Sequence, residues 1–304
     1  MGTKRGAAPP AGSAGAGWAY DPGRSEIAAP PTRVADRVRS AVSSSLVPIS
    51  SPLFFDLADA IRVGGAAYSA ETVLRVLDPY LSDARRTRIG SVVAGRAFGV
   101  VPVLEGLVDP GNVNAVLRSA EGLGFGAAHV VGLEGDAAAL AAQVEAGDEP
   151  TVEDRRAARR ASQGAHKWVE VRSWRDPAEY VAWVHGRGGR VAVTALRDDA
   201  LPVTAWDFSR PTALVVGNEH AGASAAMLDA ADAALLLPLD GFVQSYNVSV
   251  AAALALYHAR ADRAARGAHA DLDAAQRRTL AAHYTARAVP LAAALLAEHA
   301  RRAG

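Results

Sequence analysis

The feature that most constrains the fold is an alternation of short apolar runs and helical patterns between residues 99 and 265. The apolar runs predict strands at Val100–Leu104, Ala127–Gly132, Arg190–Leu196, Thr212–Val216 and Ala234–Leu239. Helical patterns lie between or after them, at Val113–Leu123, Pro177–His185, Ala223–Ala231 and Asn247–Ala265. Because strands that alternate with helices form parallel sheets covered by helices, we expect an α/β domain with a mostly parallel sheet.

The rest of the chain follows three other patterns. Residues 1–50 are rich in Ala, Gly, Pro and Ser with little hydrophobic periodicity, so we expect a disordered extension. Residues 51–98 carry apolar side chains at three- and four-residue intervals, which predicts a helical extension with a helix start at Ser69. Residues 266–304 are rich in Ala and predict a helical tail. The expected division is therefore 1–50, 51–98, 99–265 and 266–304.

Composition excludes several classes of protein. Without cysteine the chain has no disulfide, thiolate metal site or cysteine nucleophile. No run approaches the roughly 18 apolar residues that span a bilayer, so we expect no membrane span. The eight His residues lie far apart without HExxH spacing, and we expect no metal site. A Walker A loop and a GxGxxG fingerprint are also absent.

These exclusions favour a soluble intracellular protein, with the cytoplasm as the first expectation. Targeting to an organelle by residues 1–50 stays open, because basic residues outnumber acidic ones there. Asp21, Glu26 and Asp36 weigh against a transit peptide, which is ordinarily poor in acidic residues.

The charge is zero overall but unevenly distributed. The 32 Lys and Arg residues balance 32 Asp and Glu residues. Arg118 is the only basic residue between 101 and 154, and residues 211–258 contain no Lys or Arg. The blocks before, between and after these two are basic. A neutral chain can thus present basic faces to a polyanion, although solvated helices also alternate in charge.

A turn signal marks the first segment with functional potential. Asp109-Pro110-Gly111-Asn112 follows an apolar run, and Asn112 is placed to cap the helix that carries Arg118. Arg118 could simply form a structural ion pair with Glu121 or Glu105. The alternative is that this lone cation in an acidic neighbourhood has a function.

Two further segments place turn residues at the ends of apolar strands. One strand runs into Gly217-Asn218-Glu219, and Ser224 is placed to cap the helix after it. The other ends near Pro238 and is followed by a polar loop to Asn247, where a helix begins. Open α/β sheets bind ligands at this edge, and a helix N-terminus suits an anion or a polarised ligand.

Together and in this order, the three segments resemble the motifs of the SpoU (TrmH) family of RNA ribose 2′-O-methyltransferases, of the SPOUT class. The resemblance rests on Asn112 and Arg118, on Gly217-Asn218-Glu219 with Gly222 and Ser224, and on Pro238, Gly241 and the run from Ser245 to Ala251. It covers roughly residues 80–265. The stretches 162–168 and 194–199 are most similar to the tRNA-modifying TrmH branch, which acts on a guanosine of the D-loop. Tyr246, Asn114 and Ala223 depart from the family, which usually has Leu, Gly or Ser, and Leu there.

The resemblance implies a trefoil-knotted, mostly parallel sheet flanked by helices, with S-adenosylmethionine as cofactor. It assigns the catalytic side to Asn112, Arg118, Glu219, Ser245 and Asn247. It assigns cofactor binding to Leu196, Gly217, Asn218, Leu237, Tyr246 and Asn247. The family is often described with the arginine at position 118 activating the ribose hydroxyl. Since a guanidinium is a poor base, we consider binding of the adjacent phosphate as the other role.

The implied partners are RNA and a second copy of the chain. The arginines that flank the motifs are candidate RNA contacts, namely Arg85, Arg86, Arg88, Arg96, Arg260, Arg263 and Arg266. Another candidate cluster is Arg155, Arg156, Arg159 and Arg160, where a solvated helix face is an equally good explanation. The family works as a homodimer packed through the knot and the last helix, here the helix with Val250 and Leu254.

The main hypothesis is therefore a methyltransferase acting on the ribose 2′-hydroxyl of a tRNA guanosine. An rRNA ribose 2′-O-methyltransferase is the alternative within the same chemistry, because the motifs report the reaction rather than the RNA. A non-catalytic RNA-binding relative is the alternative from another class. The presence of Asn112, Arg118, Glu219, Ser245 and Asn247 argues against it.

Overall fold

The structure is a computed structural model that describes residues 52–133 and 165–303. The expectations for residues 1–50 and for the arginine cluster at 155–160 lie outside the described residues. Among the described helices, no single one is long and apolar enough to cross a membrane. The bent pair Ala274–Ala288 and Ala292–Arg302 meets those criteria only when both helices are taken together.

The centre of the molecule is a parallel sheet of seven strands in the order β5-β4-β3-β8-β6-β9-β7. The strands are β3 (Val100–Glu105), β4 (Ala127–Val131), β5 (Glu170–Trp174), β6 (Arg190–Thr194), β7 (Leu201–Pro202), β8 (Thr212–Val216) and β9 (Ala233–Leu236). The central strands β3, β4 and β8 are buried at every position. They read as continuous apolar runs because helices cover both faces of the sheet.

Helices cover the two faces of this sheet in pairs. On one face lie α4 (Pro110–Gly122) and α9 (Val248–Ala265), which pack against each other, and on the other lie α7 (Pro177–Gly186) and α8 (Ala225–Ala230). Alternate strand residues face opposite sides. In β3, Val101 and Val103 join the core under α7 and α8, whereas Val100 and Leu104 join the cores under α9 and α4.

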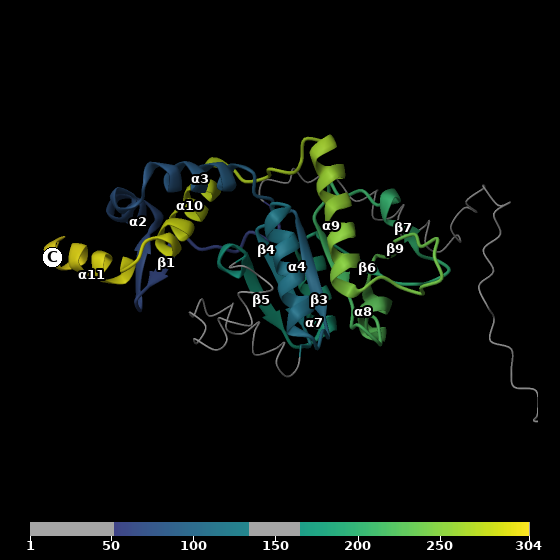
Figure 1. Cartoon of the computed structure of the whole chain (residues 1–304). Coiled ribbons are helices and arrows are strands. Elements are labelled where there is room, and N and C mark those ends of the chain that lie inside the picture. The colour runs from purple at the N-terminus through teal and green to yellow at the C-terminus, as the bar shows by residue number, and fades with distance from the viewer. Residues whose placement is uncertain (1–51, 134–164, 304) are drawn as a thin grey trace, which may run out of the picture.

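Both flanks of the sheet domain build one accessory unit at its side (Figure 1). Its elements are β1 (Ala60–Val63), β2 (Ala66–Ser69), α2 (Ala70–Leu77), the 3-10 turn η1 (Asp78–Tyr80), α3 (Asp83–Ala94), α10 (Ala274–Ala288) and α11 (Ala292–Ala303). Helix α10 packs against α2 and α3, and α11 packs against α2. The segments before and after the sheet domain therefore share one core, rather than forming two independent extensions.

The accessory unit is joined to the sheet domain by buried polar contacts. The Asp271 carboxylate accepts hydrogen bonds from the backbone N–H groups of Phe98 and Gly99, at 2.9 and 2.7 Å. It also pairs with the Arg263 guanidinium at 2.8 Å. These bonds fix the chain that leaves α9 against the start of β3.

The predicted strands and helices of the sheet domain are confirmed to within a few residues at their ends. The predictions missed β5 and β7, and the 3-10 turns η2 (Ala165–Trp168) and η3 (Val203–Ala205). Strand β5 is one edge of the sheet and only Val171 in it is buried, so it lacks a continuous apolar run.

The helical prediction for residues 51–98 is wrong between Ala60 and Ser69, where β1 and β2 form an antiparallel hairpin. Ile61 fits a helical spacing, but it is the inward residue of β1. The turn contains Gly64 and Gly65, both with positive φ, and a Gly-Gly pair is a hairpin signal. Beyond the hairpin, Ser69 caps α2 through a hydrogen bond from the backbone of Thr72, as predicted.

Candidate active site

The loop after β8 folds back tightly on itself, and a glycine permits this. A Cβ atom at Gly217 would lie 2.1 Å from the backbone nitrogen of Ala223, so only glycine fits. Asn218 and Gly222 exchange two backbone hydrogen bonds at 2.9 and 3.0 Å, and Gly222 has a φ of +71°. The loop is therefore a closed turn with a fixed backbone.

The side chain of Asn218 holds this loop against the neighbouring strand end. Its Oδ1 accepts hydrogen bonds from the backbone N–H groups of His220 and Ala221, at 2.8 and 2.9 Å. Its Nδ2 donates to the carbonyl oxygen of Gly106 at 2.7 Å. Asn218 thus positions the loop, and both the oxygen and the nitrogen of its side chain already have hydrogen-bond partners.

Ser224 caps α8 beside a buried carboxylate, Glu105, which the sequence analysis considered only as an ion-pair partner of Arg118. Its Oγ accepts from the backbone of Met227, so the predicted cap is confirmed. The Glu105 side chain, 5% exposed at the end of β3, accepts hydrogen bonds from Ser224 Oγ and from the Ser224 backbone N–H. The sequence signal for this contact was an acidic residue at the end of an apolar strand. A carboxylate that is buried there needs hydrogen-bond donors such as those of Ser224.

Three polar side chains from the three sequence motifs form one hydrogen-bonded row. Asn112 Nδ2 donates to Glu219 Oε1 at 3.0 Å. Asn247 Nδ2 donates to Asn112 Oδ1 at 3.3 Å. We call Asn247, Asn112 and Glu219 the polar row. It connects α4 with the loop after β8 and with the start of α9, whose residues lie 107 and 135 positions away from Asn112 in the sequence.

Asn112 reaches Glu219 because it does not cap α4. Asp109 is the N-cap and accepts from the backbone N–H of Gly111, so the prediction of Asn112 as the cap is wrong. Asn112 lies within the first turn, 9% exposed, with its amide turned toward the other motifs.

The carboxylate of Glu219 is held in its charged form. Partial burial alone would raise its pKa. The hydrogen bonds from the Asn112 side chain and from the backbone N–H groups of Val108 and Asp109 outweigh this effect and bring the pKa below its usual value. Glu219 therefore carries a negative charge at neutral pH.

The start of α9 is closed by its own polar residues. Asn247 is the N-cap, and its Oδ1 accepts from the backbone N–H and the hydroxyl of Ser249, at 2.9 and 2.6 Å. The Tyr246 hydroxyl donates to the Pro238 carbonyl oxygen at 3.1 Å and so closes the loop between β9 and α9. Tyr246 thus has a structural contact of its own at the position where it departs from the family.

A pocket of about 450 Å³ opens between these loops at the carboxyl ends of the strands. Its walls include seven predicted site residues, namely Leu196, Gly217, Asn218, Glu219, Leu237, Ser245 and Tyr246. Other wall residues are Thr194, Arg197, His220, Leu228, Leu235, Leu239 and Gln244. Asn112 and Asn247 lie next to the pocket through their bonds in the polar row.

The residues of this pocket fit a nucleoside-type cofactor. Its volume lies within the range of about 300–1,000 Å³ of small-molecule sites. Leucine side chains line one part and the backbone of the closed loop another, which suits an apolar ring with polar edges. The one basic residue in its wall, Arg197, is neutralised by two hydrogen bonds to Asp199 at 2.8 and 2.9 Å. A cationic ligand in the pocket would therefore be attracted by the Glu219 carboxylate. No unpaired Lys or Arg among the described wall residues would repel it.

Arg118 does not line the pocket. It lies six residues after Asn112, about 240° further around the α4 axis, and its side chain is exposed. It forms no hydrogen bond or ion pair with another residue in the described parts of the chain. Glu121 pairs instead with Arg96, and Glu105 binds Ser224. The structural ion pair considered for Arg118 is therefore not formed with either carboxylate.

Two of the predicted RNA contacts are wrong. The Arg96 side chain is 1% exposed and is bonded to Glu121, to the Tyr284 hydroxyl and to the carbonyl oxygen of Phe125. Arg263 is 2% exposed, and its guanidinium binds Asp271 and backbone carbonyl oxygens. Both guanidiniums bind groups within the chain and are out of reach of RNA.

The remaining arginines are exposed. Arg85 stacks on the Trp168 ring at 5.2 Å, Arg86 pairs with Asp83, and Arg266 pairs with Asp262. Arg88 and Arg260 form no hydrogen bond or ion pair with other described residues, so their guanidiniums are free to meet an anion.

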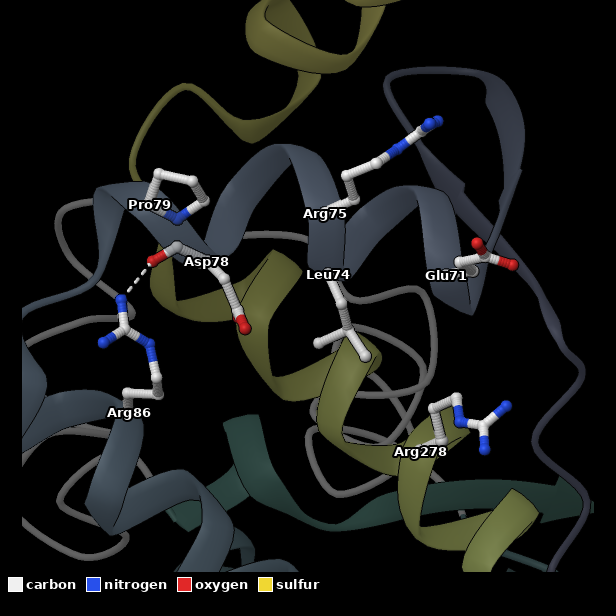
Figure 2. A pocket seen from close by; sticks show the side chains of 7 residues that line it. All are labelled: Glu71, Leu74, Arg75, Asp78, Pro79, Arg86 and Arg278. Atoms are coloured by element: carbon white, nitrogen blue, oxygen red, sulfur yellow. Dashed lines mark hydrogen bonds between the residues drawn. The ribbon is translucent and has the colours of Figure 1, made fainter.

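A second hollow, of about 570 Å³, lies on the accessory unit beside α2 and α10 (Figure 2). Its lining residues are Glu71, Leu74, Arg75, Asp78, Pro79, Arg86 and Arg278. Arg86 donates to the Asp78 carbonyl oxygen at 2.8 Å on one side of this hollow. Among the described residues, no group of three or more His, Asp or Glu side chains is arranged to hold a metal ion.

A family model and several known proteins are similar to this chain. The model of the SpoU rRNA Methylase family matches residues 99–257. The tRNA (guanosine(18)-2'-O)-methyltransferase of Thermus thermophilus is 36% identical over 186 residues, which cover 61% of this chain and 87% of that protein. The 23S rRNA (guanosine(2553)-2'-O)-methyltransferase RlmP of Bacillus subtilis is 35% identical over 160 residues, 53% of this chain and 57% of that protein.

One solved structure is similar to this chain in fold. The TrmH/SpoU tRNA modifying enzyme of A. aeolicus superimposes with a TM-score of 0.58 at 24% identity, over 68% of this chain and 98% of that one. At this identity the likeness shows the fold alone. The family match over more than half of the chain and the long alignment with the Thermus protein lead to the same assignment. The chain belongs to the SpoU methylase family.

Proposed function

We propose that this chain transfers a methyl group from S-adenosylmethionine to the ribose 2′-hydroxyl of a guanosine in the D-loop of tRNA. The observation that carries the proposal is the polar row beside the pocket, which joins one residue from each of the three motifs. The 36% identity with a tRNA guanosine-2'-O-methyltransferase over 87% of that protein supports tRNA as the substrate.

The pocket between the three loops would hold the cofactor. Leu196, Leu237 and the backbone of Gly217 would contact the nucleoside, with Asn218 and Tyr246 keeping the loops in place. Bound there, S-adenosylmethionine supplies a methyl group activated by a positively charged sulfur. The ionised Glu219 carboxylate offers favourable electrostatics for that charge.

The chain's main contribution would be positioning. Holding a hydroxyl in line with a methyl donor supplies roughly 7–11 kcal/mol of a displacement barrier. The polar row fixes Asn112 and Asn247 next to the pocket, and Ser245 lies in its wall. The exposed Arg118 would bind the phosphate next to the target ribose, because its planar fork suits bidentate phosphate recognition.

Exposed arginines would extend this binding along the RNA backbone. Arg85 and Arg88 on α3 and Arg260 on α9 are exposed. The hollow on the accessory unit adds Arg75 and Arg278 (Figure 2). Their contribution is expected to depend strongly on salt, because it releases counterions from RNA.

A homodimer is the expected assembly. The surface of α9 exposes Val250, Leu254 and Tyr257 at three- and four-residue spacing, and Phe242 is fully exposed in the preceding loop. Such a contiguous apolar stripe is typical of a surface that is covered by another chain. Sedimentation of the wild-type chain and of a Leu254→Glu variant would test it, with the monomer expected only for the variant.

Ribosomal RNA is the second candidate substrate. It is favoured by the 35% identity with RlmP, although the chain covers only 57% of that protein. We place the reaction inside the cell, where both RNA classes and the cofactor are found.

Incubation with labelled S-adenosylmethionine and either total tRNA or rRNA, followed by mapping of the modified nucleotide, decides between the tRNA and the rRNA substrate. Binding of the cofactor without labelling of either RNA would leave no support for the proposed reaction. Binding of RNA without the cofactor would indicate a non-catalytic RNA-binding relative.

A further inference from the structure

The pocket that the proposed function, on which this inference rests, assigns to the cofactor has a wall that depends on one loop. Residues 217–223 form a continuous part of this wall, so the position of the loop decides the shape of the pocket. The loop follows β8, and the neighbouring strand β3 runs parallel to it with Leu104 opposite Val216. Residues 105 and 217 therefore leave the sheet side by side.

Hydrogen bonds to the end of β3 hold this loop at both of its ends. At the first end, the Asn218 side chain donates to the carbonyl oxygen of Gly106 at 2.7 Å. At the second end, Ser224 donates twice to the Glu105 carboxylate, from its hydroxyl to Oε1 and from its backbone N–H to Oε2 at 3.1 Å. Helix α8, which begins there, has six residues with one buried side chain, so it adds little to hold Ser224.

The side chain of Glu105 is a buried charge at the end of an otherwise apolar strand. Its exposed fraction is 5%, and the residue lies outside the pocket wall. A buried carboxylate is costly unless hydrogen bonds replace its contacts with water. Ser224 supplies one donor to each of its two oxygens. An apolar side chain would complete β3 at lower cost, but it could not hold Ser224.

We propose that Glu105 is a positioning residue that keeps the cofactor pocket in its binding shape. It fixes Ser224, and the preceding Ala223 packs so closely on Gly217 that a Cβ atom there would lie 2.1 Å from the Ala223 nitrogen. A shift of Ser224 therefore disturbs the whole loop. Without Glu105 the loop spends part of its time displaced, and the apparent Kd of a ligand rises as the binding-competent fraction falls.

Calorimetry with S-adenosylhomocysteine compares four variants with wild type. Glu105→Ala removes both acceptors and should raise the Kd about tenfold. Ser224→Ala removes only the hydroxyl donor and should raise it about threefold. In Glu105→Gln the amide can accept from the Ser224 N–H and donate to its hydroxyl, so the Kd should stay within about twofold of wild type. The matched control is Asp232→Ala, which removes a carboxylate that binds the Val191 N–H and His185 at the amino end of β6 and should leave the Kd unchanged.

A double variant and hydrogen exchange separate positioning from a general loss of stability. Glu105→Ala combined with Ser224→Ala should bind no more weakly than Glu105→Ala alone, because both changes break the same contact. In the ligand-free protein, the backbone N–H groups of Asn218 and Gly222 close the loop. They should exchange about tenfold faster in Glu105→Ala than in wild type, and at the wild-type rate in Asp232→Ala.

Wild-type affinity of Glu105→Ala, or unchanged exchange at Asn218 and Gly222, would overturn the inference and leave the proposed function in place. A Glu105→Gln variant that binds as weakly as Glu105→Ala, or that loses affinity only for the positively charged S-adenosylmethionine, would also overturn it. The charge of Glu105 rather than its two hydrogen bonds would then be responsible. If Glu105→Ala does not fold, Ser224→Ala and Glu105→Gln make the same comparison. Absence of S-adenosylhomocysteine binding by wild type would remove the assigned cofactor site, and with it both the proposed function and this inference.

Discussion

Replacing Asn112 by aspartate is a sharp test of the polar row. In the native chain the Asn112 amide donates to Glu219 at 3.0 Å. Asn112→Asp puts a carboxylate oxygen in place of the donor, so that two negative charges lie about 3 Å apart. Their repulsion is about 1.4 kcal/mol in bulk water and about 5.5 kcal/mol at an effective dielectric constant of 20. Since Glu219 is only partly buried, we expect a destabilisation of about 1–3 kcal/mol.

The destabilisation by Asn112→Asp is expected to increase with pH. In the native chain the pKa of Glu219 is lowered, so its contribution to stability is present above the pKa of an unfolded glutamate, about 4.3, and is lost as pH falls. In Asn112→Asp the like charge raises the carboxylate pKa in the folded state. The variant is therefore penalised increasingly as pH rises above about 4.3.

Thermal unfolding at pH 4 and pH 7.5 measures this difference. At about 2–4 °C per kcal/mol, the Tm of Asn112→Asp should lie about 3–10 °C below wild type at pH 7.5 and approach it at pH 4. Asn112→Ala is the control, because it removes the donor without adding a charge and should show little of this pH trend. A Tm deficit of Asn112→Asp that is no larger at pH 7.5 than at pH 4 would refute the contact between these two side chains.

Three further predictions concern other residues. Arg96→Met should lower the free energy of unfolding by about 3 kcal/mol, because it removes buried hydrogen bonds and an ion pair, while Arg88→Met on the surface should change it by less than about 0.5 kcal/mol. Equal urea midpoints for the two variants would contradict this. Burial lowers the pKa of His129 to about 3. Its neutral form therefore contributes fully above an unfolded pKa of about 6.5, and about 2 kcal/mol of that is lost at pH 5. Urea unfolding of His129→Asn should lack this part of the pH slope, and an unchanged slope would disprove it. Arg118→Lys should bind S-adenosylhomocysteine normally in calorimetry but lose methyl transfer, and near-normal turnover would argue against bidentate phosphate recognition.

The sheet domain was predictable because its strands are buried on both faces. Strands such as Thr212–Val216 then read as continuous apolar runs between turn residues, and this signal is local. The edge strand β5 alternates and is partly exposed, so its signal is weaker. The hairpin at Ala60–Ser69 escaped detection because Ile61 satisfies both a helical and a strand period.

The sequence pointed to seven residues that line the pocket, but it did not reveal their contacts. Asp109 and Asn112 are both suitable helix caps, and Glu219, which turns Asn112 inward, lies 107 residues away in sequence. In the same way, the burial of Arg96 follows from its contact with Tyr284, 188 residues further along the chain. When the partner of a side chain is that remote in sequence, the neighbouring residues do not indicate that the side chain is buried. Every arginine of a basic cluster is then predicted to be exposed.

The most direct test of the proposed function asks which atom receives the methyl group. Two tRNA transcripts would be compared with labelled S-adenosylmethionine, one intact and one with a 2′-deoxy nucleotide at the mapped guanosine. We expect one methyl group per intact transcript and none on the deoxy transcript, because the accepting oxygen is absent. Equal labelling of both transcripts would place the methyl group on the base and contradict the assignment of the 2′-hydroxyl.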